Sequence, residues 1–127
     1  MAYEYFNNNP MLRNVGDCSV RAISKALDID WESAYITLFV NGYAMCDMPS
    51  SDSVWGAVLR QNGFYRKAVE DTCPDCYTAE DFLMDNPKGT FVLAFGGHVA
   101  TAVDGVLYDS WDSSHEIPQF YYYKKGE

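Results

Sequence analysis

The chain has 127 residues, of which 48% are hydrophobic and 16% aromatic, so it can bury a sizeable core and is not intrinsically disordered. Nine basic against eighteen acidic residues give a net charge of −9, which disfavours a general nucleic-acid or anionic-membrane binder. No stretch reaches the ~20 apolar residues of a membrane span, and the N-terminus lacks the basic start and apolar run of an export signal. We therefore expect one cytoplasmic domain over 1–127.

The first half of the chain is predicted to be helical. The stretch up to about Val15 is polar and rich in asparagine, which is typical of an extended arm or loop. A helix is predicted from about 18 to 27, with Asp17 as its N-cap and its apolar residues on one face. Two more helices are predicted, one at about 31–40 that ends at Asn41-Gly42 and one at about 53–61.

The second half is predicted to form strands. After a short strand at about 64–69, a variant capping box at Thr78–Asp81 opens a short helix that ends near Met84. Four strands follow, at 90–95, 98–103, 106–111 and 119–124. Because helices come first and strands second, we expect an α+β fold in which N-terminal helices pack on a C-terminal antiparallel sheet.

Cys18 is the first candidate for chemistry. It lies in the first turn of the predicted helix, where unpaired backbone N–H groups and the helix dipole stabilise a thiolate. The neighbouring carboxylate of Asp17 opposes this effect. By position alone, Cys18 is equally well interpreted as a small buried apolar residue.

A predicted hairpin brings a histidine close to a carboxylate. Asp104-Gly105 is a strong two-residue turn, and this turn places Val103 opposite Val106. The same register makes His98 and Asp109 diagonal neighbours on one face, about 7–8 Å apart at the backbone. An imidazole and a carboxylate can bridge that distance. The sequence therefore predicts a histidine base with its own orienting acid.

The other cysteines and the second histidine receive simpler interpretations. Cys73 and Cys76 form a Cys-x-x-Cys pair, for which we favour reduced thiols in a loop, with a zinc site and a redox pair as alternatives. Cys46 and His115 could complete a metal set, but their spacing does not indicate one. His115 lies in a polar stretch that is typical of a solvated loop. We expect no metal or organic cofactor.

Taken together, these segments resemble papain-like cysteine peptidases. The resemblance rests on three segments in the family's order: Gly16-Asp17-Cys18, Gly97-His98-Val99 and Asp109-Ser110-Trp111. The last is similar to the Asn-Ser-Trp segment of papain relatives, with Asp in place of Asn. The size resembles compact bacterial and phage members, such as bacteriocin-leader peptidases and cell-wall endopeptidases. The stretch 17–23 also resembles uncharacterised phage and bacterial proteins of this group.

The chain departs from this family at the oxyanion hole. Papain relatives usually carry a Gln about six residues before the nucleophile, where this chain has Leu12. Asn14 or Asn9 could supply the amide instead, and Asn14 is favoured because it is closer in sequence. Losing one such donor costs roughly 3 kcal/mol of transition-state stabilisation in related acyl transfer.

The resemblance implies a papain-like thiol hydrolase that cleaves a peptide or isopeptide amide bond in a protein or peptide substrate. Cys18 would be the nucleophile, His98 the base and Asp109 the orienting acid, with Asn14 at the oxyanion hole. Two alternatives stay open. One is a transglutaminase-like acyltransferase, in which an amine replaces water. The other is a catalytically weak or inactive papain-like fold that serves as a phage or bacterial protein-binding factor.

Overall fold

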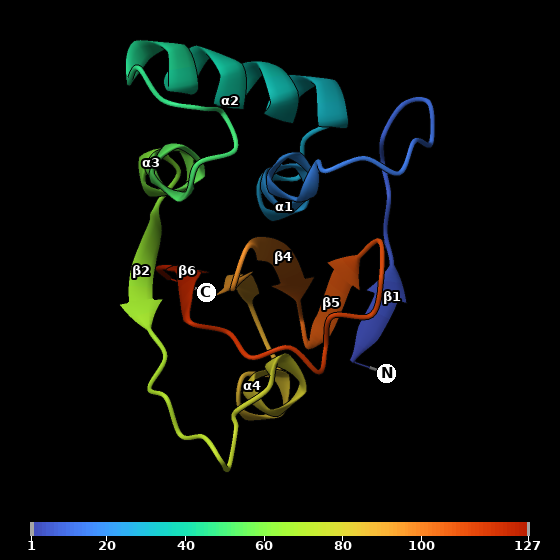
Figure 1. Ribbon diagram of the computed structural model, residues 1–127, viewed down its shortest axis with the longest axis vertical. Helices are drawn as coiled ribbons and strands as arrows, with labels where there is room; N and C mark the ends of the chain where they lie inside the picture. The colour runs from blue at the N-terminus through green and yellow to red at the C-terminus, as the bar shows by residue number, and fades with distance from the viewer. Residues whose placement is uncertain (1, 127) are drawn as a thin grey trace.

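The computed structural model describes residues 2–126 and shows an α+β fold (Figure 1). Four helices, most of them in the N-terminal half, pack on a six-stranded mixed sheet. The helices are α1 (Cys18–Leu27), α2 (Trp31–Ala44), α3 (Asp52–Gln61) and α4 (Ala79–Asp85). The strands are β1 (Tyr3–Tyr5), β2 (Phe64–Ala68), β3 (Thr90–Phe95), β4 (His98–Val103), β5 (Val106–Asp109) and β6 (Phe120–Lys124).

The sheet separates two layers of helices. Its strand order is β1-β5-β4-β3-β6-β2, so β4 and β3 are central. Helices α1 and α3 cover one face, α4 covers the other, and α2 lies outside α1 and α3 (Figure 1). Because α1 packs mainly on β4, the start of the first helix lies beside a central strand.

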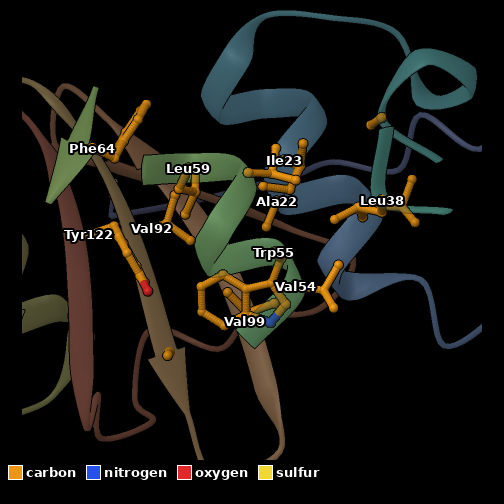
Figure 2. Packing of buried hydrophobic residues seen from close by; sticks show 14 residues of the cluster. Ala22, Ile23, Leu38, Val54, Trp55, Leu59, Phe64, Val92, Val99 and Tyr122 are labelled. Carbon is orange, nitrogen blue, oxygen red and sulfur yellow. The ribbon is translucent and has the colours of Figure 1, made fainter. Parts of the chain in front are cut away.

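Alternating residues of the strands build two apolar clusters. In β3, Val92 and Ala94 face α1 and α3, whereas Leu93 and Phe95 face α4. Figure 2 shows the first cluster, in which Trp55 of α3 fills the space above the sheet. Because both faces are covered, the central strands are buried on both sides.

The sheet is mixed, which corrects the expectation of an antiparallel one. Tyr3–Tyr5 forms β1, which pairs in parallel with β5 at the sheet edge. These residues were expected to lie in an arm or loop. Backbone hydrogen bonds drive the pairing, since Leu107 N donates to the carbonyl of Ala2 and Phe6 N to the carbonyl of Asp109, both at 2.7 Å. An edge strand this short has too few residues for a detectable alternation.

Helix α2 is longer than predicted, because Asn41-Gly42 does not end it. Gly42 is buried, and a Cβ atom there would lie 3.0 Å from the backbone of Asp47 and of Pro49. The glycine therefore permits close packing of the following loop rather than a helix stop. The helix instead runs to Ala44, and the left-handed residue after it is Cys46, at φ 54°.

The burial of α2 is confined to a narrow strip, although Trp31, Tyr35, Leu38 and Phe39 are spaced to share one apolar side of the helix. Only Leu38 of these is fully buried, together with Ala34 and Gly42. Both Tyr35 and Phe39 are at least half exposed.

Other local predictions are confirmed. The capping box of α4 has both of its reciprocal hydrogen bonds, between Thr78 and Asp81. The Asp104-Gly105 turn has positive φ at both residues, 48° and 82°, as a type I′ turn requires. Within residues 2–126, no helix has the length and apolar character that crossing a membrane would need.

Candidate active site

Three elements bring Cys18, His98 and Asp109 together. Cys18 is the first residue of α1, His98 the first of β4 and Asp109 the last of β5. Because α1 packs on β4, the half-buried thiol lies at the start of that strand, close enough to the His98 ring and the Val99 amide for both to shift its pKa. Residues 80 positions apart in the sequence thus form one contact.

The hairpin register places His98 on Asp109, as predicted. The observed pairs are Val103 with Val106, Ala102 with Leu107 and Thr101 with Tyr108, so the hairpin is in the predicted register. His98 Nε2 lies 2.6 Å from Asp109 Oδ2. With Nε2 bound to the carboxylate, Nδ1 is the ring nitrogen left to meet the thiol.

Two aromatic rings flank the imidazole. The Trp111 ring lies 4.8 Å from that of His98, centroid to centroid, and the Phe95 ring lies 6.0 Å away in a stacked arrangement. These neighbours leave 14% of the His98 side chain exposed. Burial lowers the pKa of His98, but hydrogen bonds to Asp109 and Cys18 outweigh it and raise the pKa to about 9. The imidazolium form is therefore favoured at neutral pH.

The environment of Cys18 favours its thiolate. Burial raises the pKa of the thiol. Interactions with the His98 ring and the Val99 amide lower it, as do the positive charges of His98 and Arg21, and together these outweigh burial. The net pKa is below the ordinary thiol value. Thiolate and imidazolium thus stabilise each other.

Asp109 is buried and surrounded by donors. Its side chain is 1% exposed and accepts from Ser113 Oγ at 2.6 Å, from the Ser110 amide at 2.7 Å and from Arg21 Nη2 at 3.3 Å. Burial raises the pKa of Asp109, yet hydrogen bonds from His98 and Ser113 and the His98 charge bring it below the usual range. A carboxylate held by four donors has little freedom to rotate away from the imidazole.

Asp17 does not act as predicted. It precedes α1, but its side chain makes no cap hydrogen bond. Its carboxylate instead forms a buried ion pair with Arg21 and accepts from Trp31 Nε1 at 2.9 Å. The reason is competition: a buried guanidinium one turn away offers a stronger partner than the helix amides. Arg21 therefore neutralises the charge that would otherwise oppose a thiolate at Cys18.

Arg21 and Ser113 were missed as functional candidates from the sequence. Arg21 contacts both Asp17 and Asp109 and so ties α1 to the end of β5. The Asp17–Arg21 spacing of four residues is a recognised helix ion-pair signal and could have identified half of this bridge. No local pattern links Arg21 to Asp109, or Ser113 to the triad, because both contacts depend on tertiary packing.

The structure places the remaining predicted residues away from these contacts or in other roles. Asn14 lies exposed in the loop before α1, and Asn9 is buried, with its side-chain oxygen accepting from the Met11 amide at 2.9 Å. His115 is exposed, as expected, 3.7 Å from Glu80. Among residues 2–126, no three His, Cys, Asp or Glu side chains cluster as a metal site would require.

Cys73 and Cys76 form a disulfide, which corrects our preference for reduced thiols. A tight turn brings the two residues together, since Thr72 Oγ1 donates to the Asp75 carbonyl at 2.6 Å and the Cys73 amide to Asp71 at 3.1 Å. Cys18 and Cys46 are free.

Comparison of the chain with protein families, curated proteins and solved structures finds no match. Function is therefore inferred from the site alone. The site places an imidazole between a half-buried thiol and a buried carboxylate. These are the groups needed for nucleophilic attack on an acyl carbon followed by proton transfer to the leaving group. A cysteine with a purely structural role would not require an adjacent imidazole and carboxylate.

Proposed function

We propose that this protein is a papain-like thiol hydrolase that cleaves a peptide or isopeptide amide bond. The observation that supports it most is the 2.6 Å contact of His98 Nε2 with Asp109 Oδ2, with the Cys18 thiol near enough to the same ring that each shifts the pKa of the other. The order of these residues along the chain, and the elements that carry them, are similar to those of papain relatives. The Cys18 pKa is low and the His98 pKa is high, which suits a preformed ion pair.

The proposed reaction has two steps. The Cys18 thiolate attacks the carbonyl carbon, the C–N bond breaks, and the His98 imidazolium gives its proton to the departing amine. His98 then takes a proton from water and the resulting hydroxide attacks the thioester. The C–S bond breaks, the carboxylic acid leaves, and the thiolate–imidazolium pair is restored. Asp109 keeps Nε2 protonated, so that Nδ1 carries out both proton transfers.

The oxyanion of each tetrahedral intermediate needs two donors. The backbone N–H of Cys18 is one, because the first N–H groups of a helix have no acceptor within the helix. We propose the side-chain amide of Asn14 as the second. Asn14 lies in the exposed loop that leads into α1, four residues before Cys18.

A small activated ester tests the chemistry without knowledge of the substrate. p-Nitrophenyl acetate should acetylate Cys18 and then be turned over, with the thioester seen by intact mass spectrometry. Cys18→Ser and His98→Ala should abolish turnover, whereas the matched control Cys46→Ser should leave it unchanged. The same readout with an added primary amine distinguishes the acyltransferase alternative, because the acetyl group would then appear on the amine.

One result would leave only the binding-factor alternative. If Cys18 is acetylated no faster than Cys46, and His98→Ala makes no difference, the thiol is not activated. The hydrolase proposal then fails.

A further inference from the structure

The outer face of α2 exposes the largest run of apolar side chains on a single element in the described chain. Figure 1 shows α2 as the outermost helix, with α1 and α3 beneath it. Small and aliphatic residues on its inner side are buried, whereas its outer side is exposed. The outer-face residues are at least 50% exposed: Tyr35, Ile36, Phe39, Val40 and Tyr43. Apolar surfaces of this kind usually mark a protein interaction site.

The stretch of sequence that contains α2 carries charges of one sign only. Residues 26–59 contain five acidic residues and no lysine, arginine or histidine. Three of the five lie at or before the start of α2 (Asp28, Asp30, Glu32), and Asp47 follows its end. The fifth, Asp52, begins α3 and lines a separate pocket with Arg60 and Arg66. An apolar stripe with carboxylates at both ends complements a partner that has an apolar stripe with basic ends.

A groove joins this face to the segment that leads into α1. It has a volume of about 430 Å³, and its lining includes Trp31, Tyr35 and Met48 together with Val15 and Gly16. Gly16 lies two residues before Cys18. One basic side chain, Arg13, also lines the groove. A segment bound along α2 would therefore extend toward the start of α1.

We propose that the outer face of α2 binds an amphipathic helix of another protein, with basic residues flanking its apolar stripe. The stripe from Tyr35 to Tyr43 is about 12 Å long, or roughly two turns of a partner helix. A second copy of this chain fits less well. Pairing two α2 helices, parallel or antiparallel, would bring carboxylates against carboxylates at both ends. The proposal goes beyond the hydrolase function and holds whether or not the thiol cleaves the partner.

Two designed peptides test the surface. One is an amphipathic helix of about 14 residues made of leucine and lysine, and the other replaces each lysine with glutamate. Fluorescence anisotropy should show binding of the lysine peptide only. Phe39→Ser and Tyr43→Ser should each weaken that binding about tenfold. Met84→Ser, at a comparably exposed apolar position on α4, should not.

A second pair of variants tests the charges. Asp28→Asn/Glu32→Gln removes two carboxylates beside the start of α2, and Glu70→Gln/Asp75→Asn removes two from the distant disulfide loop. At low salt the first pair should weaken binding severalfold and the second should not, with the difference shrinking at high salt.

Several outcomes would overturn the proposal. These are failure of the lysine peptide to bind, equal binding of the glutamate peptide, or equal effects of Phe39→Ser and Met84→Ser in variants whose circular dichroism is unchanged. Light scattering provides a further check: a wild-type dimer that Phe39→Ser converts to a monomer would identify a second copy as the occupant instead.

Discussion

The two free cysteines lie at opposite kinds of helix end. Cys18 is the first residue of α1, half buried, and in contact with His98. Cys46 follows the C-terminal end of α2 and is exposed in a loop, next to Asp47. A helix N-terminus presents partial positive charge and a C-terminus partial negative charge, so the first favours a thiolate and the second does not.

The contrast shows that placement, rather than residue type, distinguishes the two free thiols. The chain has two free thiols and two histidines, but only one of each lies in the polar network between α1, β4 and β5. His115 is exposed on a loop, far less constrained than the His98 ring. Cys46 and His115 therefore serve as internal controls for the changes described below.

Removing Arg21 should have the largest effect on the network that distinguishes Cys18 from Cys46. Arg21→Gln leaves the carboxylates of Asp17 and Asp109 buried with one fewer donor each, at a cost of about 3–5 kcal/mol in the free energy of unfolding. Urea denaturation measures the loss. Asp17→Asn/Arg21→Gln should recover part of it, because one of the stranded charges is gone. An unchanged urea midpoint for Arg21→Gln would contradict the bridging role.

His98→Ala should make Cys18 react like Cys46. Because the imidazole lowers the pKa of the wild-type thiol, its alkylation by iodoacetamide near pH 6 should be faster than that of an unperturbed thiol. Without the imidazole the rate should fall about 100-fold, because an ordinary thiol is almost fully protonated at that pH. Peptide mass spectrometry can follow both cysteines in one sample. The control His115→Ala should change neither rate, and a similar fall there would refute the assignment.

Asp109→Asn should reduce Cys18 reactivity about tenfold. Arg21 and the Ser110 amide contact Oδ1, so the new amide nitrogen would point at His98 Nε2 and donate to it. The ring proton would then move to Nδ1, which could no longer accept from the thiol. Alkylation rates measure the effect, with the exposed Asp112→Asn as the matched control. Equal rates for the two variants would argue against an orienting role.

The smallest effect is expected in the pH dependence of the unfolding free energy. It is measured in Cys18→Ser, where the thiol no longer contributes to the titration of His98. The folded-state pKa of His98 is raised to about 9 from an ordinary 6.5, so its contribution is complete below pH 6.5 and is lost as pH rises toward 9. Removing the thiol also removes its share of the rise in the His98 pKa. The unfolding free energy should still fall by about 1–2 kcal/mol across that pH window. The decline should disappear in Cys18→Ser/His98→Ala. A decline that persists in this double variant would show that a group other than His98 titrates in this range.

The elements that could be predicted are those whose signals are local. The Asp104-Gly105 turn defined the register of β4 and β5, and that register was enough to place His98 beside Asp109. The capping box at Thr78 is a signal of the same kind. Gly42 misled the prediction because a glycine that ends a helix and one that admits a neighbouring backbone look the same in sequence.

By itself, the sequence determined the order of the elements after β1, the helix start at Cys18 and the histidine–carboxylate pair of one hairpin. Each depends on signals within one helix or one hairpin, where backbone geometry alone sets the contact. Only the tertiary structure decided that Cys18 meets His98 and that Arg21 joins Asp17 to Asp109. It also left one side of α2 apolar and uncovered. Those features depend on how α1 and α2 dock on the sheet, and docking is determined by packing over the whole core.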